Sequence, residues 1–309
     1  MMPFAELSSP LERLYHPAAG EAGIQLFCKR DDLLSPAPGT ALQGNKVRKL
    51  APVLRRALAA RRPPLLVSFG GAYSNHASAL ATAGKRYHLP VHLFIRGEEV
   101  DNPVLDRAVA DGATLERISR AEYRQHRDEN WRSRQVLRLA QRYDLAPEEI
   151  WIIPEGGTSP QAIESVSAIV GEITEALGDA PDYVALSAGT GGTAAGVILA
   201  AEAKTRIEIF PALKGSWMRE EINSRLPSPP KASWTCIHDH HFGGYGRFPQ
   251  EWRIPSAGFA TRADISEPGL PPLEAIYTAK LFSGVLTRIR QGCYPPGSTI
   301  VVLHTGGIY

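Results

Sequence analysis

The sequence has 309 residues, of which 43% are hydrophobic and 21% charged, and its formal net charge is +2. These values are ordinary for a soluble globular protein and give no reason to expect broad attraction to nucleic acid or membranes. No apolar run approaches the ~18–20 residues that span a bilayer, and the N-terminus has early acidic residues and no apolar stretch typical of a secretory signal. Cys28, Cys236 and Cys293 lie far apart and form no CxxC pair, so we expect no disulfide framework and a reduced, cytoplasmic protein.

From about residue 64 the pattern alternates between strand and helix. Short apolar runs predict strands over residues 65–71, 90–97, 113–119, 150–157, 183–192, 206–213 and 298–307. The segments between them predict helices over residues 74–88, 102–112, 121–143, 160–177 and 193–204. This order predicts a parallel α/β architecture with crossover helices between the strands. We expect a small lobe over residues 45–158 and a larger lobe formed by residues 1–44 and 159–309.

Four of the predicted strands end in glycine-rich turns. In chain order these turns read SFGGAYSNH, PEGGTSP, SAGTGGTAAG and LHTGG. Ligands of open parallel sheets bind outside the carboxyl ends of the strands. We therefore expect the four turns to border one crevice.

The turn SAGTGGTAAG, residues 187–196, is the most explicit candidate for binding phosphate. Its glycines let backbone N–H groups approach an anion, Thr190 and Thr193 add hydroxyl donors, and the following helix presents its positive N-terminus. The pattern is not a Walker A loop, and it contains no GxGxxG that would favour a dinucleotide. The alternative interpretation is a tight strand–helix turn that needs glycine only for packing.

Two segments that contain histidine indicate different roles. YSNH, residues 73–76, gathers a phenol, a hydroxyl, an amide and an imidazole at a helix start. This favours a carboxylate-binding cluster with a hydroxyl for proton transfer, and a plain helix N-cap is the alternative. HDHH, residues 238–241, matches no metal-binding spacing, so we expect no metal site. The FGGYG that follows indicates a loop that shapes a pocket.

GNKVRKL, residues 44–50, contains Lys46, Arg48 and Lys49 in a dense basic cluster. A lysine that forms an imine needs a lowered amine pKa, which neighbouring cations such as Arg48 and Lys49 can help to supply. If residues 45–55 are helical, Lys46 and Lys49 lie one turn apart on the same face. One of them could then form an imine while the other meets a phosphate. The alternative is the solvated start of a surface helix.

Seven motifs occur in order along almost the whole chain: KRDDLL…GNKVRKL, SFGGAYSNH, PEGGTSPQA, SAGTGGTAAG, DHHFGGYGR, IYTAK and LHTGG. Together they resemble the 1-aminocyclopropane-1-carboxylate deaminase/D-cysteine desulfhydrase family. That family belongs to the tryptophan-synthase-β-like, fold-type II enzymes that use pyridoxal 5′-phosphate (PLP). The resemblance implies a two-lobed parallel-sheet α/β fold, PLP as cofactor, a small amino acid as substrate and a homodimer.

The resemblance also implies, residue by residue, which side chains hold the cofactor. Lys46 resembles the lysine that binds the PLP aldehyde as an imine, and Lys49 resembles a lysine on the phosphate side. The other cofactor contacts that it implies are Asn45, Asn75, Thr190, Gly191, Gly192, Thr193, Thr278 and Thr305.

The same motifs imply catalytic and substrate-binding residues. Ser74, Asn75 and His76 occupy the site that meets the substrate carboxylate and α-carbon. Tyr245 and Tyr277 match two active-site tyrosines, each a candidate acid, base or substrate contact. Either the lysine that binds PLP or Ser74 would remove the α-proton, and the sequence does not choose between them.

One position bears on the type of reaction. The deaminases of the family carry Tyr-Glu where this chain has Tyr277-Thr278, and a threonine hydroxyl cannot supply the negative charge that keeps the pyridine nitrogen protonated. His76 stands where the deaminases tend to carry glutamine. Both features favour α,β-elimination from a D-amino acid such as D-cysteine, giving pyruvate, sulfide and ammonia. The alternatives are 1-aminocyclopropane-1-carboxylate deaminase, which forms α-ketobutyrate, and a PLP-binding protein without robust turnover.

Overall fold

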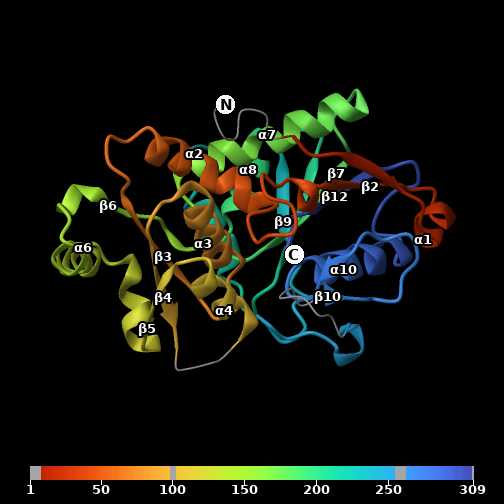
Figure 1. Cartoon of the computed structure of the whole chain (residues 1–309). Helices are drawn as coiled ribbons and strands as arrows, with labels where there is room; N and C mark the ends of the chain where they lie inside the picture. Colours follow the sequence, from red (N-terminus) through yellow and green to blue (C-terminus); the bar gives the residue numbers. More distant parts are fainter. Residues whose placement is uncertain (1–7, 98–101, 255–261, 308–309) are drawn as a thin grey trace.

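The computed structural model describes residues 8–97, 102–254 and 262–307, which form two main sheets covered by helices (Figure 1). The four-stranded sheet has the strand order β5-β4-β3-β6, and its neighbouring strands are parallel. Its strands are β3 (Leu65–Gly70), β4 (Val91–Arg96), β5 (Thr114–Ile118) and β6 (Ile150–Ile152).

Helices cover both faces of the four-stranded sheet. One face packs against α2 (Asn45–Leu58), α3 (Asn75–Tyr87) and α4 (Pro103–Ala110). The other face packs against α5 (Arg120–Tyr123) and α6 (Glu129–Tyr143). Every residue of β3 is buried, because a central strand with helices on both sides needs a continuous apolar run.

The six-stranded sheet has the order β1-β2-β12-β7-β8-β9, in which β1 is antiparallel to β2 and the other neighbours are parallel. Its strands are β1 (Leu11–Leu14), β2 (Gln25–Arg30), β7 (Tyr183–Ala188), β8 (Arg206–Pro211), β9 (Ser233–Cys236) and β12 (Thr299–His304). The helices on its two faces are α1 (Pro17–Glu21) with α10 (Thr278–Arg290), and α7 (Pro160–Leu177) with α8 (Gly192–Ala200) and α9 (Met218–Asn223). A short hairpin joins β10 (Arg262–Ala263) to β11 (Leu273–Glu274).

The alternation of strands and crossover helices predicted from the sequence is confirmed, but several elements differ in their bounds. The strands expected over residues 150–157 and 183–192 end at Ile152 and Ala188. The helix expected over residues 121–143 is interrupted, because Asp128 adopts an extended backbone and its side chain caps α6 by accepting from the N–H of Trp131 at 2.7 Å. The helix expected over residues 193–204 ends at Ala200, where the next residue turns to an extended conformation.

The two sheets draw on different parts of the chain. The four-stranded sheet is built from residues 65–152, and the six-stranded sheet from residues 11–30 and 183–304. Helix α2 packs against α3 and also against α7, so it lies between the two sheets. The lobe boundaries at residues 45 and 158 stay predictions. In the part of the chain that the structure describes, no helix has the length and apolar character to cross a bilayer.

Candidate active site

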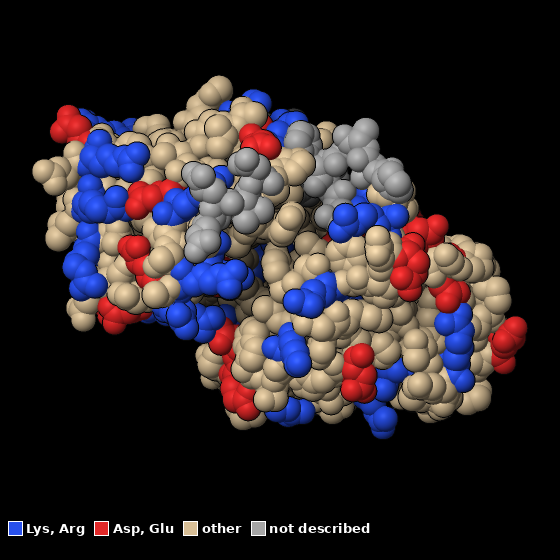
Figure 2. Space-filling view, turned by 90° about the horizontal axis from the view of Figure 1, so that it is seen from below, with Lys and Arg blue, Asp and Glu red and all other residues tan. Residues whose placement is uncertain are grey.

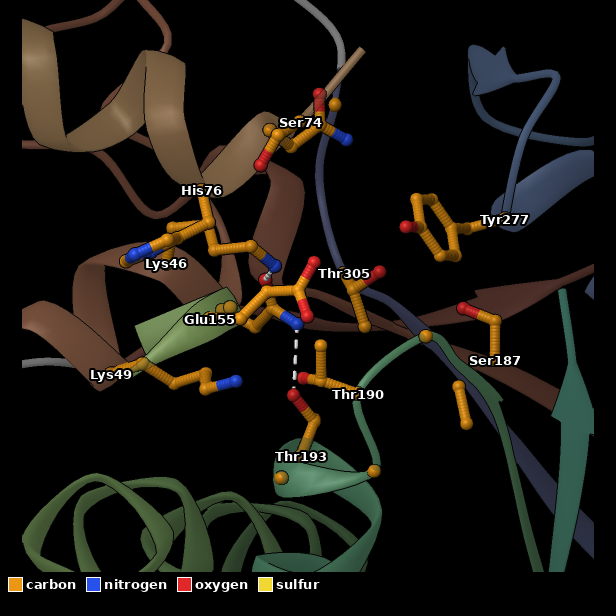
Figure 3. A pocket seen from close by; sticks show the side chains of 18 of the residues that line it. Lys46, Lys49, Ser74, His76, Glu155, Ser187, Thr190, Thr193, Tyr277 and Thr305 are labelled. Carbon is orange, nitrogen blue, oxygen red and sulfur yellow. Dashed lines mark hydrogen bonds between the residues drawn. The ribbon is translucent and has the colours of Figure 1, made fainter. Parts of the chain in front are cut away.

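A cavity of about 270 Å³ lies at the carboxyl ends of strands from both sheets. All four glycine-rich turns contribute to its lining, through residues such as Gly71, Gly156, Gly191 and Gly306. The expectation that the four turns border one crevice is therefore confirmed. Figure 2 shows a hollow between the two halves of the molecule with Lys and Arg side chains on its rim, and Figure 3 shows the side chains that converge in the cavity.

Lys46 reaches the cavity because the start of α2 is fixed against the turn that follows β12. The N–H of Asn45 donates to the carbonyl oxygen of Thr305 at 3.1 Å. Gly44 has a φ of 65°, and a Cβ there would lie 2.1 Å from the same oxygen. Only glycine allows this approach at this backbone angle. The turn at Gly44 thus places the first residues of α2, Lys46 among them, along the cavity.

The amine of Lys46 lies among neutral hydrogen-bonding groups. Its Nζ donates to Asn45 Oδ1 at 2.7 Å, and Asn45 Nδ2 donates to Thr193 Oγ1 at 2.9 Å (Figure 3). Burial lowers the pKa of Lys46 to about 8, while the negative charge of Glu274 opposes this shift. The sequence-based explanation through Arg48 and Lys49 is therefore wrong, because desolvation supplies the shift.

Arg48 takes part in a separate, largely buried ion cluster. Its guanidinium contacts Asp31 Oδ1 at 2.8 Å and Glu172 Oε1 at 2.6 Å, and Lys29 contacts Glu172 Oε2 at 2.5 Å. The Arg48 side chain has 0% exposure. Arg48 is therefore paired with acidic side chains and is not part of a solvated helix start.

Lys49 and the start of α8 form a site suited to a phosphate group. The N-cap of α8, Gly191, provides no side-chain hydrogen bond to the helix, so the first N–H groups remain available for an anion. Lys49 Nζ donates to Thr158 Oγ1 at 2.8 Å. A Cβ at Gly192 would lie 3.0 Å from that Nζ and 2.5 Å from Thr158 Oγ1, so glycine keeps the approach open. Burial lowers the pKa of Lys49, as do the charges of Lys46 and Arg225.

The three residues expected to bind substrate all line the cavity, but their side chains differ in direction. Ser74 is the N-cap of α3, and its Oγ accepts from the N–H of Ala77 at 3.2 Å. Asn75 begins the helix. The ring of His76 is 2% exposed and lies beside Gly157 and Lys49, so its imidazole is on the Lys49 side rather than beside Ser74 (Figure 3).

Hydrogen bonding determines the tautomer of His76. Ser68 Oγ donates to the carbonyl oxygen of Ile153 at 2.8 Å and lies 2.8 Å from His76 Nε2, so Nε2 carries the proton. The other nitrogen, Nδ1, is buried and has no hydrogen-bond partner among the described residues. Burial and the charges of Lys49 and Lys46 lower the pKa of His76, which keeps the ring neutral. The expected contact of His76 with the substrate stays a prediction.

Tyr245 and Tyr277 form the opposite wall of the cavity, with ring centroids 6.1 Å apart. Burial raises the pKa of both phenols, so they stay protonated at neutral pH. A Cβ at Gly189 would lie 3.0 Å from the Tyr277 ring. Glycine at this point therefore brings the ring against the turn after β7. The prediction that the FGGYG loop shapes a pocket is confirmed, since Tyr245 lines the cavity.

Thr278 does not line the cavity. Its hydroxyl accepts from the N–H of Glu274 at 2.9 Å and donates to the carbonyl oxygen of the same residue at 3.1 Å. The side chain is fully buried at the start of α10. The expected contact of Thr278 with the cofactor ring stays a prediction. Ser187 and Thr305 are the hydroxyl-bearing residues that line the cavity beneath Tyr277 (Figure 3).

Several residues of the site were missed from the sequence. Arg96, Arg127, Glu155, Ser187 and Trp217 line the cavity. Arg96 ends β4 and Glu155 follows β6, so the rule that ligands bind at carboxyl ends of strands could have found both. Glu274 is buried outside the cavity lining, and its charge raises the pKa of Lys46. Burial raises the pKa of its own carboxyl, and no sequence pattern indicated this residue.

Within the described ranges, no group of three or more His, Cys, Asp or Glu residues could hold a metal ion.

The cavity fits PLP in two respects. The uncapped start of α8, Thr190, Thr193 and the amine of Lys49 provide donors for a phosphate at one end. At a short distance along α2, Lys46 offers an amine of lowered pKa for the aldehyde. The unpartnered Nδ1 of His76 leaves one further buried acceptor in the lining.

Comparisons with known proteins point the same way. Residues 4–216 match the family model described as "Pyridoxal-phosphate dependent enzyme". The bifunctional D-cysteine desulfhydrase/1-aminocyclopropane-1-carboxylate deaminase of Arabidopsis thaliana is 26% identical over 328 residues, covering 98% of this chain and 77% of the relative. The 1-aminocyclopropane-1-carboxylate deaminase of Burkholderia vietnamiensis is 25% identical over 337 residues, covering 97% and 90%. A crystal structure of an ACC deaminase homologue has a TM-score of 0.72 and 25% identity, covering 98% of this chain and 91% of that chain.

Proposed function

The chain belongs to the family of pyridoxal-phosphate-dependent enzymes, and on this premise we propose that it catalyses α,β-elimination from a small D-amino acid. With D-cysteine and water as reactants, the products are pyruvate, hydrogen sulfide and ammonia. In this reaction the Cα–H and Cβ–S bonds break, and water then releases the nitrogen as ammonia.

The observation that carries this proposal is the side chain at position 278. The deaminases that the chain resembles have a glutamate there, whose charge keeps the ring nitrogen of PLP protonated. Thr278 has no charge, and its hydroxyl is already bonded to the backbone of Glu274. A less electron-withdrawing ring suits substrates whose β-carbon carries a good leaving group better than it suits opening of a cyclopropane.

The residues of the cavity have separate tasks in this proposal. PLP, when bound, supplies the electron-withdrawing ring that stabilises negative charge at the substrate α-carbon. Lys46 holds the cofactor and, with a pKa of about 8, has a sizeable neutral fraction that can accept the α-proton at Nζ. Ser74 is the alternative base. The protonated phenols of Tyr245 and Tyr277 can donate a proton to the leaving group.

A second candidate is 1-aminocyclopropane-1-carboxylate deaminase, because two of the relatives compared above carry that activity in their names. This function predicts α-ketobutyrate and ammonia from that substrate. Thr278→Glu introduces the carboxylate of the deaminases and is expected to raise the ratio of cyclopropane opening to D-cysteine elimination. Thr278→Ser, which keeps a hydroxyl, is the matched control and is expected to leave the ratio unchanged.

The test is an assay of ammonia and keto acid over the D and L forms of cysteine, serine and β-chloroalanine, together with 1-aminocyclopropane-1-carboxylate. We expect pyruvate from D-cysteine and D-β-chloroalanine. Activity restricted to L-substrates would overturn the D preference. PLP binding with no keto acid from any of these compounds would favour a PLP-binding protein without robust turnover.

A further inference from the structure

Arg96 is a cation of the cavity for which the described residues include no acidic partner. It is the last residue of β4, is exposed, and lines the cavity. Its Nη2 lies 3.7 Å from the position of a Cβ on Gly71, and its guanidinium carbon lies 5.6 Å from the centroid of the Tyr123 ring. These contacts place the guanidinium beside the turn that leads to Ser74, because the N–H of Ser74 donates to the carbonyl oxygen of Gly71 at 3.1 Å.

Each of the other cations that line the cavity has either an ion-pair partner or a proposed contact with the cofactor. Lys46 is assigned to the cofactor aldehyde and Lys49 faces the phosphate site. Arg127 contacts Glu221 Oε1 at 3.0 Å. Residues 8–97, 102–254 and 262–307 provide no ion-pair partner for Arg96, so its charge stays uncompensated within them.

Glu155, the acidic residue among the described cavity-lining residues, contacts side chains other than Arg96. Glu155 Oε1 accepts from the hydroxyl of Tyr123 at 2.7 Å, and its Oε2 lies 3.6 Å from His126 Nε2. Glu155 therefore has bonding partners of its own in Tyr123 and His126. A guanidinium that is uncompensated at the wall of a binding cavity is a strong site for a carboxylate or a similar planar anion, because it offers paired N–H donors.

The position of Arg96 relative to α3 indicates which part of the substrate it meets. The substrate α-carboxylate is expected at the start of α3, at Ser74 and Asn75, where the positive end of the helix dipole favours an anion. Arg96 lies beside the preceding turn, at Gly71. On the basis of the function proposed above, we propose that Arg96 binds a second negatively charged group at the end of the substrate side chain. The substrate class is then an amino acid whose β-substituent carries a distal carboxylate or sulfonate.

A binding experiment tests this inference without turnover. Protein loaded with PLP is titrated with D-glutamate and with D-glutamine, which have similar shape but differ in charge, while the absorption band of the cofactor is followed. The L pair is titrated separately. We expect glutamate to bind about 10- to 100-fold more tightly, the range of a charged hydrogen bond. Arg96→Gln is expected to remove this difference by weakening glutamate alone.

The control is Arg86→Gln, which removes an arginine from the last turn of α3, away from the cavity lining. It is expected to leave both affinities unchanged. Equal affinities for glutamate and glutamine in the wild-type protein would overturn the inference. So would an Arg96→Gln variant that weakens both ligands equally, since that result indicates a contact with the α-carboxylate or a structural role.

A turnover experiment separates this inference from the function on which it rests. S-carboxymethyl-D-cysteine and its neutral counterpart S-carbamoylmethyl-D-cysteine both release pyruvate, ammonia and a thiol by elimination. We expect the wild-type protein to prefer the anionic compound in kcat/KM and Arg96→Gln to lose the preference. Equal turnover of both compounds by both proteins would overturn the inference and leave the elimination function intact. Preferred binding of glutamate with no pyruvate from either compound would support the inference and overturn the function.

Discussion

Two faces of helix α2 carry buried cations in opposite electrostatic settings. On one face, Arg48 lies between the carboxylates of Asp31 and Glu172. On the other face, Lys46 and Lys49 donate to an amide oxygen and a hydroxyl, and burial lowers the pKa of both amines.

This comparison shows that burial of a cation does not by itself reveal its role. A buried cation with compensating carboxylates keeps its charge and connects parts of the fold, whereas a buried amine without them is driven toward its neutral, nucleophilic form. The counter-charges come from the turn after β2 and from α7, outside α2 itself. The following predictions test whether the two faces differ in this way.

The largest effect is expected from Lys46→Ala. Covalent binding of PLP should be lost, and turnover should fall by about 10²–10⁴-fold, the usual contribution of a positioned acid–base group. Borohydride reduction followed by peptide mapping identifies the lysine bound to PLP. Lys49→Ala is the control, in which PLP binds more weakly but the label stays on Lys46. A label on Lys49 in the wild-type protein would contradict the assignment.

Arg48→Met removes the cation from the paired face and leaves the buried carboxylate of Asp31 without its counter-charge. Loss of one partner of a buried pair costs about 3–5 kcal/mol of unfolding free energy, which chemical denaturation measures. Arg56→Met on the same helix removes a guanidinium that lies over the Trp151 ring, and it should cost about 1 kcal/mol or less. Similar losses in the two variants would show that the paired face has no special structural role.

The pH dependence of cofactor uptake sharpens the comparison. The free amine is the reactive form, so the rate at which apoprotein takes up PLP should rise with pH through the Lys46 pKa of about 8 and then level off. The absorbance of the bound cofactor gives this rate. Glu274→Gln should move the midpoint to lower pH, because the charge of Glu274 raises the pKa of Lys46. A midpoint at the ordinary value for lysine would disprove the lowered pKa.

The smallest effect is expected from Thr193→Val, which removes the hydroxyl that accepts from Asn45 Nδ2. Loss of one hydrogen bond corresponds to about 0.5–1.5 kcal/mol, so PLP affinity should fall by roughly 2- to 10-fold in a cofactor titration. Thr287→Val is the control, since its hydroxyl donates to Ser283 within α10. Unchanged affinity in Thr193→Val would show that the hydroxyl does not organise the site.

The strands and their glycine-rich turns could be predicted from the sequence, because apolar runs and glycines are local signals and parallel topology brings strand ends together. The different environments of the three basic residues in GNKVRKL, residues 44–50, could be only partly predicted. The partners of Arg48 are 17 and 124 residues away along the chain, and no local pattern reveals such pairs. The bonds of the Thr278 hydroxyl to the backbone of Glu274 could not be predicted for a related reason, since a motif gives the identity of a side chain but not the direction in which its hydroxyl bonds.

The bond between Asn45 and Thr305 has a consequence for the order of assembly during synthesis. The segment that carries Lys46 leaves the ribosome early, yet the carbonyl that fixes it belongs to the turn after β12. Strand β12 itself inserts between β2 and β7, in the interior of the six-stranded sheet. A nascent chain that has not yet released β12 therefore lacks both an interior strand of this sheet and the carbonyl oxygen that holds the start of α2.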